Sequence, residues 1–275
     1  MTGVQTCALP IYLPITFSLG ASAPAGASIK TNGIFSWVPS CAQASTTNLI
    51  TIWATDNYSI PLSNSVSFVV VVSECLEVGV GSTVMQIGTT SSVPVSVIST
   101  LGLTNLSFAV AYPTNRFTNW VMTVSNSAIG TALVQSLDPS QTLFSLAASN
   151  GQTITGPALL GSLSFKALPG DSAFVPLTPA NVVGTKTEGS AVGNSSGQAG
   201  RVVVIGREPL LEAWMASNST LMLTIYGNPG TNYQVAYSTN LTVPNWQPDF
   251  SVLMTNLFES VPVDQTAPQL FYRAQ

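Results

Sequence analysis

The chain is composed of short runs of alternating or β-branched residues, separated by glycine, proline, asparagine and serine. Runs of this length with a two-residue period place successive side chains on opposite faces of a sheet. In LSFAVAY, residues 106–112, large apolar side chains alternate with serine and alanine, which predicts a half-buried strand of an antiparallel sheet. Helical periodicity is almost absent: EPLLEAWMAS, residues 208–217, could form a turn or two of helix, or equally a strand between domains. The sequence therefore predicts an all-β fold.

Length and composition favour several secreted domains. The chain has 275 residues, 45% of them apolar, enough for one large domain or for two or three ordinary domains that each bury a core. Only 7% are charged, so serine, threonine, asparagine, glutamine and glycine must supply the polar surface, as is common in secreted bacterial β-proteins. The net charge is −4 and the basic residues are scattered singly, which excludes a nucleic-acid footprint. No apolar run reaches the roughly 18 residues of a membrane helix, so we expect no membrane span.

The residue types needed for common catalytic sites are missing or dispersed. The chain has no histidine, which excludes histidine-dependent triads and histidine-based zinc sites. The eleven aspartates and glutamates are spread among serine- and threonine-rich segments, and none forms a recognisable catalytic pair. No G-x-S-x-G nucleophile motif occurs. We therefore predict that the chain is not an enzyme.

The first eleven residues, MTGVQTCALPI, match nothing that follows them. Their back-translation resembles a widely used short-read sequencing adapter, and the reading frame continues without a break into Tyr12. We therefore expect residues 1–11 to be a non-native, adapter-derived segment, which is set aside in fold reasoning. On this interpretation Cys7 is not a native cysteine. The chain would then be the C-terminal fragment of a longer protein, with any signal peptide or enzyme domain upstream.

The strand-like runs fall into three sections. We predict a first domain at residues 12–75, a second at 76–206 and a third at 207–275. The second section closes with EGSAVGNSSGQAG, residues 188–200. Because this glycine- and serine-rich segment lies between strands, we expect a mobile loop rather than a domain linker.

The first section carries PAG at 24–26, TNGIFSWVP at 31–39 and ATDNYSIPL at 54–62. In this order the motifs resemble the immunoglobulin-like and cadherin-like repeats of bacterial surface proteins. The resemblance implies a sandwich domain, here truncated by the loss of its first strand. In TNG, Gly33 is expected to adopt a positive φ in a turn. Trp37, which shares a face with Phe35, is expected to fill the core.

Asp56 and Asn57 lie where cadherins carry a calcium-binding A-x-D-x-G-x-P motif. The resemblance makes them a candidate calcium site, and it implies no other cofactor for this chain. Tyr58 replaces the glycine of that motif, and the partner acidic motifs of cadherins are absent. Because calcium takes six to eight oxygen ligands, the alternative is that Asp56 caps a turn.

Cys41 and Cys75 are the two cysteines that remain when Cys7 is set aside. Cys41 precedes the strand-like run at 49–55, and Cys75 follows the run at 66–72. If these runs form an antiparallel hairpin, both cysteines lie at the same pole, and a disulfide between them would add roughly 3 to 4 kcal/mol. Such a bond would indicate an oxidising compartment, and the alternative is two free thiols.

The second section carries VPV at 93–95, then LSFAVAY, and later the residues Leu160, Gly161, Leu163, Phe165 and Leu177. This spacing resembles cohesins and their sandwich relatives among carbohydrate-binding modules. The cohesin tyrosine is usually followed by Asp-Pro, whereas Tyr112 is followed directly by Pro113. No binding residue is carried over from the resemblance. It implies a sandwich that is either a structural spacer or a receptor for a dockerin-like partner.

The third section carries GNPGTNY at 227–233, STNL at 238–241, Trp246 and FYRA at 271–274. This pattern resembles a short C-terminal β-module of secreted proteins of Verrucomicrobia and related bacteria. The resemblance implies a small, fibronectin-III-like β-sandwich that ends at its natural C-terminus. The alternation of Tyr233, Val235 and Tyr237 predicts one buried face, and the alternative is an exposed aromatic strip for sugar stacking.

Taken together, these features predict tandem antiparallel β-sandwich domains of a secreted or cell-surface bacterial protein. The predicted function is a non-catalytic structural or adhesive array. The alternative is an accessory region of a polysaccharide-degrading protein, which binds carbohydrate or a dockerin-type partner. We expect monomeric modules, an extracellular or cell-surface location, and partners among other surface proteins or glycans.

Overall fold

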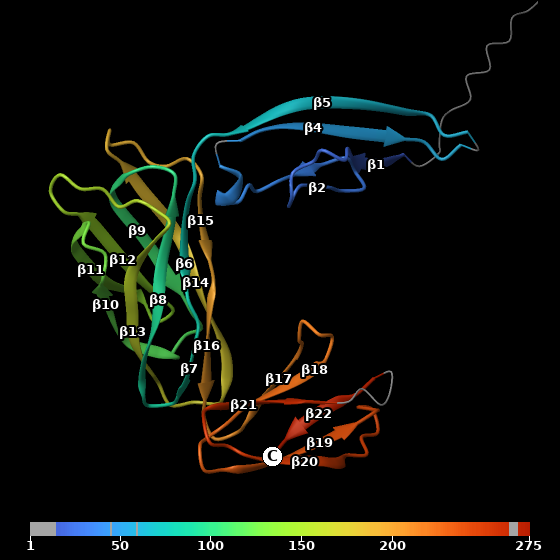
Figure 1. The fold of residues 1–275 in the computed structure, drawn as a ribbon, viewed down its shortest axis with the longest axis vertical. Helices are drawn as coiled ribbons and strands as arrows, with labels where there is room; N and C mark the ends of the chain where they lie inside the picture. The colour runs from blue at the N-terminus through green and yellow to red at the C-terminus, as the bar shows by residue number, and fades with distance from the viewer. Residues whose placement is uncertain (1–14, 45, 59, 264–268) are drawn as a thin grey trace, which may run out of the picture. The chain divides into compact units, whose positions relative to one another are not determined.

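The computed structural model describes residues 15–44, 46–58, 60–263 and 269–275 (Figure 1). These residues form strands and one short 3-10 helix, Cys41–Gln43, so the all-β prediction is confirmed. No helix in these ranges is long and apolar enough to cross a membrane. The chain divides into two compact units, Met1–Cys75 and Leu76–Gln275. The segment 1–11, interpreted above as adapter-derived, lies outside the described residues.

The first unit is built around one long hairpin. Strands β4, Thr46–Thr55, and β5, Ser63–Val72, pair antiparallel along their whole length, and β1, Thr16–Leu19, pairs with the other edge of β4. A second, shorter hairpin pairs two strands of two residues each, β2, Ser28–Ile29, and β3, Phe35–Ser36. The described part of this unit therefore contributes one three-stranded sheet and a short ribbon rather than two full sheets.

The turn between β2 and β3 confirms one prediction and corrects another. Gly33 has a φ of 82°, as expected for the TNG turn. Trp37 was predicted to fill the core, but it is only partly buried, and its Nε1 donates a hydrogen bond to the carbonyl of Ala25. The physical reason is the small size of the sheet and ribbon, which offer Trp37 little surface to pack against. Phe35 is also partly buried and meets Phe68 edge to face, with ring centroids 5.5 Å apart.

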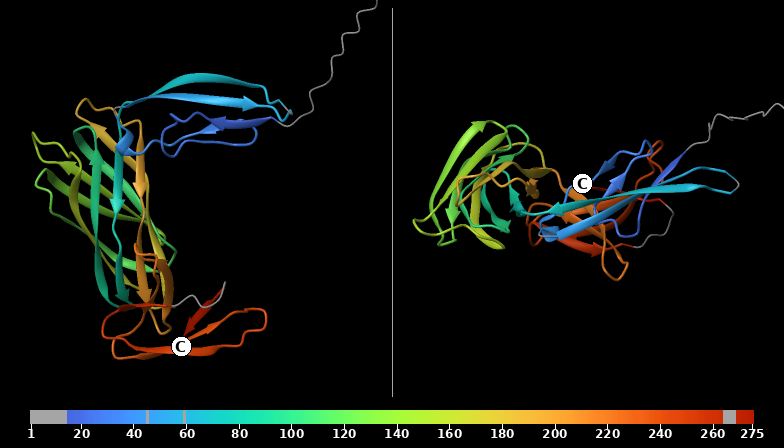
Figure 2. Two further views of the ribbon diagram at one scale, coloured as in Figure 1. Left: turned by 45° about the vertical axis from the view of Figure 1, so that its right-hand side comes forward. Right: turned by 90° about the horizontal axis from the view of Figure 1, so that it is seen from above.

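The second unit begins with eleven strands, which we call the sandwich. Their bounds are β6 Leu76–Val80, β7 Thr83–Gln86, β8 Thr90–Ser99, β9 Leu103–Ala111, β10 Phe117–Val124, β11 Ile129–Asp138, β12 Gln141–Ala148, β13 Ala158–Ala167, β14 Ala173–Lys186, β15 Ser195–Gln198 and β16 Gly200–Ile205. One sheet has the order β10-β13-β8-β6-β15, and the other has the order β11-β12-β9-β14-β16-β7. Figure 2 shows the two sheets facing one another.

The core of the sandwich lies between these sheets and follows the predicted alternation. Leu106, Phe108 and Val110 of β9 are fully buried, and Tyr112 just beyond the strand is 7% exposed. Phe108 stacks on Phe144 of β12, with ring centroids 5.4 Å apart. The prediction that LSFAVAY is a half-buried strand is therefore confirmed. Burial of such aromatic and aliphatic side chains is the main term that stabilises the fold.

Two strand pairs of the sandwich are parallel, which the sequence did not predict. β15 pairs with β6 and β16 pairs with β7 in the parallel sense. β15 lies inside the segment 188–200, which we expected to be a mobile loop, so that expectation is wrong for residues 195–198. Val192 anchors the segment in the core at 7% exposure. Gly200 permits the close approach, because a Cβ there would lie 1.8 Å from the carbonyl oxygen of Gly81.

Residues 207–275 end the second unit with six short strands, which we call the C-terminal module. Their bounds are β17 Leu210–Met215, β18 Leu221–Tyr226, β19 Asn232–Ser238, β20 Gln247–Leu253, β21 Phe258–Pro262 and β22 Phe271–Ala274. They form two three-stranded sheets, β17-β18-β21 and β20-β19-β22. The segment EPLLEAWMAS, left open between helix and strand, contains β17 and is therefore a strand.

The motif residues of the C-terminal module meet in space. Tyr233 and Val235 are buried as predicted, whereas a bulge after Val235 leaves Tyr237 only partly buried. Gly227 lies under the Tyr233 ring, because a Cβ there would be 2.3 Å from it. The guanidinium of Arg273 lies 4.5 Å from the centroid of the Trp246 indole. The spacing of these motifs is thus explained by packing within one small module.

A polar network connects the sandwich to the C-terminal module. Arg201 of β16 donates two hydrogen bonds to the carboxylate of Glu212 of β17, one of them Nη2 to Oε2 at 2.8 Å. The Tyr226 hydroxyl donates to the same carboxylate at 2.8 Å. Nearby, Asn228 donates to the carbonyl of Gly206 and accepts a hydrogen bond from Gln86 of β7. A bidentate pair with a third donor fixes the two parts more firmly than a single exposed ion pair would.

Replacing Glu212 with glutamine is expected to lower the free energy of unfolding of the second unit by about 1 kcal/mol, because the pair is partly exposed. Arg201 holds the pKa of the Glu212 carboxyl below its ordinary value. A carboxyl with a lowered folded-state pKa stabilises the fold above its unfolded pKa, and this contribution is lost as the pH falls through the folded pKa. Urea unfolding should therefore show the difference between Glu212→Gln and the parent at pH 7 and not at strongly acidic pH. A difference that is independent of pH would contradict this assignment.

Candidate binding face

Four adjacent strands, β11, β12, β9 and β14, expose one continuous sheet surface, which we call the outer face. Strand register places Leu133, Ser145, Ser107 and Val183 in one row across it. The side chains that share this side are Asn105, Ser107, Ala109, Thr131, Leu133, Gln135, Leu143, Ser145, Ala147, Ala180, Val183 and Thr185, of which Ala109 is fully buried. None of them is charged.

The outer face is hollowed between β11 and β9. Ser107, Ser145 and Ala147 have small side chains, and Thr131 and Leu133 of β11 form a wall beside them. The hollow has a volume of about 260 Å³. Leu133 is 69% exposed, and Val183 across the row is 46% exposed. The outer face therefore combines exposed aliphatic side chains with small hydroxyl groups and a shallow recess.

The opposite sheet of the sandwich presents a different surface. Its outward side chains include Ser92, Pro94 and Ser96 of β8, and it carries the charged residues Lys166 and Glu77. Protein interfaces are depleted in charge at their centre, and exposed aliphatic patches mark contact surfaces more often than scattered polar ones do. Of the two sheet surfaces, the outer face is therefore the better candidate for binding a protein.

The strand β11 also forms the edge of its sheet. Its side chains are exposed over most of its length, including Leu133, Val134 and Leu137. An edge strand with unpaired backbone groups can accept a further strand, and natural proteins usually protect such edges. The outer face therefore continues directly into an open strand edge.

The candidate calcium residues lie in the loop between β4 and β5. Asp56 Oδ1 accepts hydrogen bonds from the backbone amides of Leu62, at 2.9 Å, and Tyr58, at 3.4 Å. These contacts are those of a turn-capping aspartate. Within the described ranges there is no group of three or more cysteine, aspartate or glutamate residues that could hold a metal ion. Calcium binding by Asp56 and Asn57 stays a prediction.

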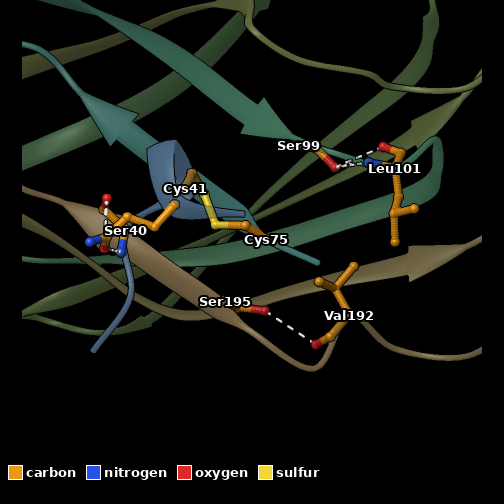
Figure 3. The surroundings of a disulfide bond; sticks show 8 residues. Ser40, Cys41, Cys75, Ser99, Leu101, Val192 and Ser195 are labelled. Atoms are coloured by element: carbon orange, nitrogen blue, oxygen red, sulfur yellow. Dashed lines mark hydrogen bonds between the residues drawn. A yellow bond between two sulfur atoms is a disulfide. The ribbon is translucent and has the colours of Figure 1, made fainter. Parts of the chain in front are cut away.

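A disulfide joins Cys41 of the 3-10 helix to Cys75 (Figure 3). The two Cα atoms are 5.3 Å apart, and the residues are 34 positions apart in the sequence. Both side chains are buried, at 8% and 1% exposure. The helix is capped by Gln43, whose Oε1 accepts a hydrogen bond from the Ser40 amide at 2.9 Å. The bond thus ties the start of β4 to the end of β5.

The alternation in LSFAVAY places Ser107, Ala109 and Ala111 on the side of β9 away from the core, but it does not identify the outer face. The missing information was the register that sets Leu133 and Val183 beside Ser107, because these residues are distant in the sequence. One usable signal was present in IGTALVQSLD, residues 129–138, where aliphatic side chains occur without regular alternation. That pattern is typical of a strand exposed on both sides.

No protein-family model matches this chain, and no curated protein matches it either. Several solved cohesin structures resemble part of it. A cohesin of Acetivibrio cellulolyticus, solved in complex with a dockerin, is 17% identical, with a TM-score of 0.40. The similarity covers 47% of this chain and 98% of that cohesin chain. A non-cellulosomal cohesin of Archaeoglobus fulgidus is 18% identical, with a TM-score of 0.38. The similarity covers 47% of this chain and 90% of that cohesin chain. A cohesin of Clostridium acetobutylicum is 16% identical, with a TM-score of 0.40. The similarity covers 48% of this chain and 91% of that cohesin chain.

Proposed function

We propose that this chain is a non-catalytic region of an extracellular or cell-surface protein, and that its sandwich binds a protein partner through the outer face. The observation that carries the proposal is the uncharged surface of β11, β12, β9 and β14, with Leu133 and Val183 exposed across one row. Removing a leucine side chain from water contributes up to about 1.5–3 kcal/mol, so Leu133 can act as a central anchor.

The chemistry of the face favours a protein over a charged ligand. It offers hydroxyl and amide groups beside aliphatic side chains, and it has no cation or carboxylate with which to hold an ion. Small side chains over the hollow would allow a partner side chain to enter between β11 and β9. Uncharged surfaces of this kind bind through shape complementarity and the exclusion of water.

A charge placed at the centre of the face tests the proposal. In the variant Leu133→Lys, binding to a protein partner is expected to fall by at least about tenfold, because a lysine would have to be desolvated without a partner. Val121→Lys is the matched control, because Val121 is 53% exposed on β10 and belongs to the other sheet. Purified dockerin modules are the first probes, since residues 76–206 resemble cohesins in sequence. Binding would be followed by surface plasmon resonance on the full chain.

Equal loss in both variants, or no loss in Leu133→Lys, would contradict the outer face as the binding surface. Absence of saturable binding to every dockerin module would contradict a dockerin-type partner.

A second candidate function is a spacer that holds neighbouring modules in a fixed arrangement. It is favoured by the Arg201, Glu212 and Tyr226 network and by Asn228, which tie the sandwich to the C-terminal module. A spacer keeps its neighbours at a fixed distance, so the connection between the sandwich and the C-terminal module should not bend. Small-angle scattering of residues 76–275 should then fit one rigid body, whereas a broad range of dimensions would contradict a spacer.

A further inference from the structure

A second recess opens at the other side of β11, where the edges of the two sheets meet. It has a volume of about 370 Å³ and lies between β10 and β11. Tyr112 and Thr142 lie at its buried end, and Trp120 forms a wall. Asn119, Ser136 and Asp138 are exposed at its mouth. We call it the edge pocket. It is separate from the outer face, because Ser136 lies on the opposite side of β11 from Leu133.

The edge pocket is shaped by a bulge in β10. Thr118 pairs with Lys166 and Val121 pairs with Ser164, so Asn119 and Trp120 together lie opposite Phe165 alone. Asn119 has a φ of 57°, in the left-handed region that costs a residue with a Cβ some strain. The extra residue turns Trp120 toward the space between the sheets. Bulges of this kind commonly redirect a side chain at a functional site.

The aromatic walls of the edge pocket are packed against one another. The Trp120 indole stacks on Tyr112, with centroids 5.1 Å apart, and lies 4.6 Å from the Phe165 ring. Phe117 contacts Tyr112, Trp120 and Phe165 as well. Because its ring is engaged by these neighbours, Trp120 serves as a fixed wall rather than as a stacking platform. A site fixed before binding loses less entropy when a ligand enters.

At the buried end of the edge pocket, one hydroxyl proton has no hydrogen-bond acceptor among the described residues. Trp120 Nε1 donates to the Tyr112 hydroxyl at 3.1 Å, and the Tyr112 and Thr142 hydroxyls share a hydrogen bond of 3.0 Å. These two hydroxyls carry two protons, and their shared bond uses one of them. Among the described residues, no side chain or carbonyl accepts a hydrogen bond from the second proton. Tyr112 is 7% exposed and Thr142 is 1% exposed, so this O–H group sits at the floor of the recess.

The mouth of the edge pocket supplies complementary groups. Asn115 and Asn119 offer side-chain amides. The hydroxyls of Thr118 and Ser136 donate to Asn119 Oδ1 and to the Asp138 carbonyl, and they can still accept. Asp138 adds a carboxylate, whose Oδ1 accepts hydrogen bonds from the Ser140 amide at 2.6 Å and its hydroxyl at 2.7 Å. These bonds hold the pKa of Asp138 below its ordinary value, so the group is an acceptor at neutral pH. The lining has no cation.

We propose that the edge pocket binds one sugar ring or a similar small polyol. Such a molecule carries hydroxyls that can accept from the floor O–H group and donate to Asp138, while its C–H groups contact the part of the Trp120 indole that lines the pocket. The volume of about 370 Å³ is near the lower end of the range of ligand pockets, which suits a single ring. The lack of a cation disfavours phosphorylated or carboxylated ligands.

The test is a saturation-transfer NMR titration of the full chain with methyl β-glucoside, methyl β-galactoside and methyl N-acetyl-β-glucosaminide. Cyclohexanol is the matched probe, since it has a ring of similar size with one hydroxyl. We expect saturable binding of at least one glycoside, with a Kd of about 1 mM for a ligand of this size, and much weaker binding of cyclohexanol. Equal binding of cyclohexanol, or no saturable binding of any glycoside, would overturn the proposal.

Variants locate the site. Ser136→Ala and Thr142→Val should each weaken glycoside binding by about five- to tenfold through the loss of one hydrogen bond. Ser145→Ala removes a hydroxyl from the outer face on the neighbouring strand and should leave binding unchanged. Ser136 is exposed, so its variant is informative even if Thr142→Val affects folding. Glycoside binding that is unaffected by Ser136→Ala, or equally weakened by Ser145→Ala, would place the sugar elsewhere and overturn the proposal.

Discussion

Reduction of the Cys41–Cys75 disulfide is expected to unfold the first unit and to leave the second unit folded. The bond spans 34 sequence positions, and closing a loop of that size stabilises a fold by about 3–4 kcal/mol. Among its described residues, the first unit buries few apolar side chains besides the two cysteines, chiefly Ile50 and Val72. A loss of this size is a large fraction of the stability of a small domain. The second unit contains no cysteine and is insensitive to the reductant.

Hydrogen–deuterium exchange with and without dithiothreitol measures this effect strand by strand. Protection should be lost in β4 and β5 and retained in β9 and β13. The double variant Cys41→Ala with Cys75→Ala should behave like the reduced protein and should not respond to the reductant. Unchanged protection of β4 and β5 after reduction would show that packing, rather than the disulfide, maintains this unit.

Replacing Phe165 with alanine is expected to lower the free energy of unfolding of the second unit by about 3–5 kcal/mol. Phe165 is fully buried, and its ring lies 4.8 Å from Phe117 and 4.6 Å from Trp120. The change therefore creates a cavity that the surrounding rings cannot close without leaving their packed positions. Because Phe165 supports the wall of the edge pocket, glycoside binding should be lost with it.

Urea unfolding monitored by fluorescence gives the stability change. Phe258→Ala is the matched control, because Phe258 is 50% exposed on β21, and its loss should cost about 1 kcal/mol or less. A Phe165 variant that is no less stable than the Phe258 variant would contradict the central position of Phe165 in the core.

Alternation along single strands was sufficient to predict the strand class and the buried side of β9. It failed where a position depends on residues far away in the sequence. The pairing of Ser195 with Leu76 is invisible locally, because a segment of serine and glycine has no apolar period. The burial of Trp37 depended on how much sheet surrounds it. Asn119 shifts the alternation of β10 by one residue, so the edge pocket could not be read from the strand pattern.

The position of the outer face also depends on residues that are distant in the sequence, so the pattern within one strand does not predict it. The alternation that places Ser107 and Ala109 on the side of β9 away from the core residues is the same in a spacer and in a receptor sandwich. The surface becomes a candidate contact surface because the neighbouring strands place the exposed side chains of Leu133 and Val183 in the same row.

The two parallel pairs at the ends of the sandwich determine how it would respond to a pulling force. The chain enters through β6 and leaves through β16; Leu76 lies level with Ser195 at one pole, and Ile205 lies level with Gln86 at the other. Tension between these points runs along the strands, so the hydrogen bonds of β6 with β15 and of β7 with β16 would be sheared together rather than opened one at a time. Resistance to force depends on the unfolding rate, and many bonds breaking at once make that rate low. A module with this geometry can transmit tension along its two edge pairs while the two sheets stay intact.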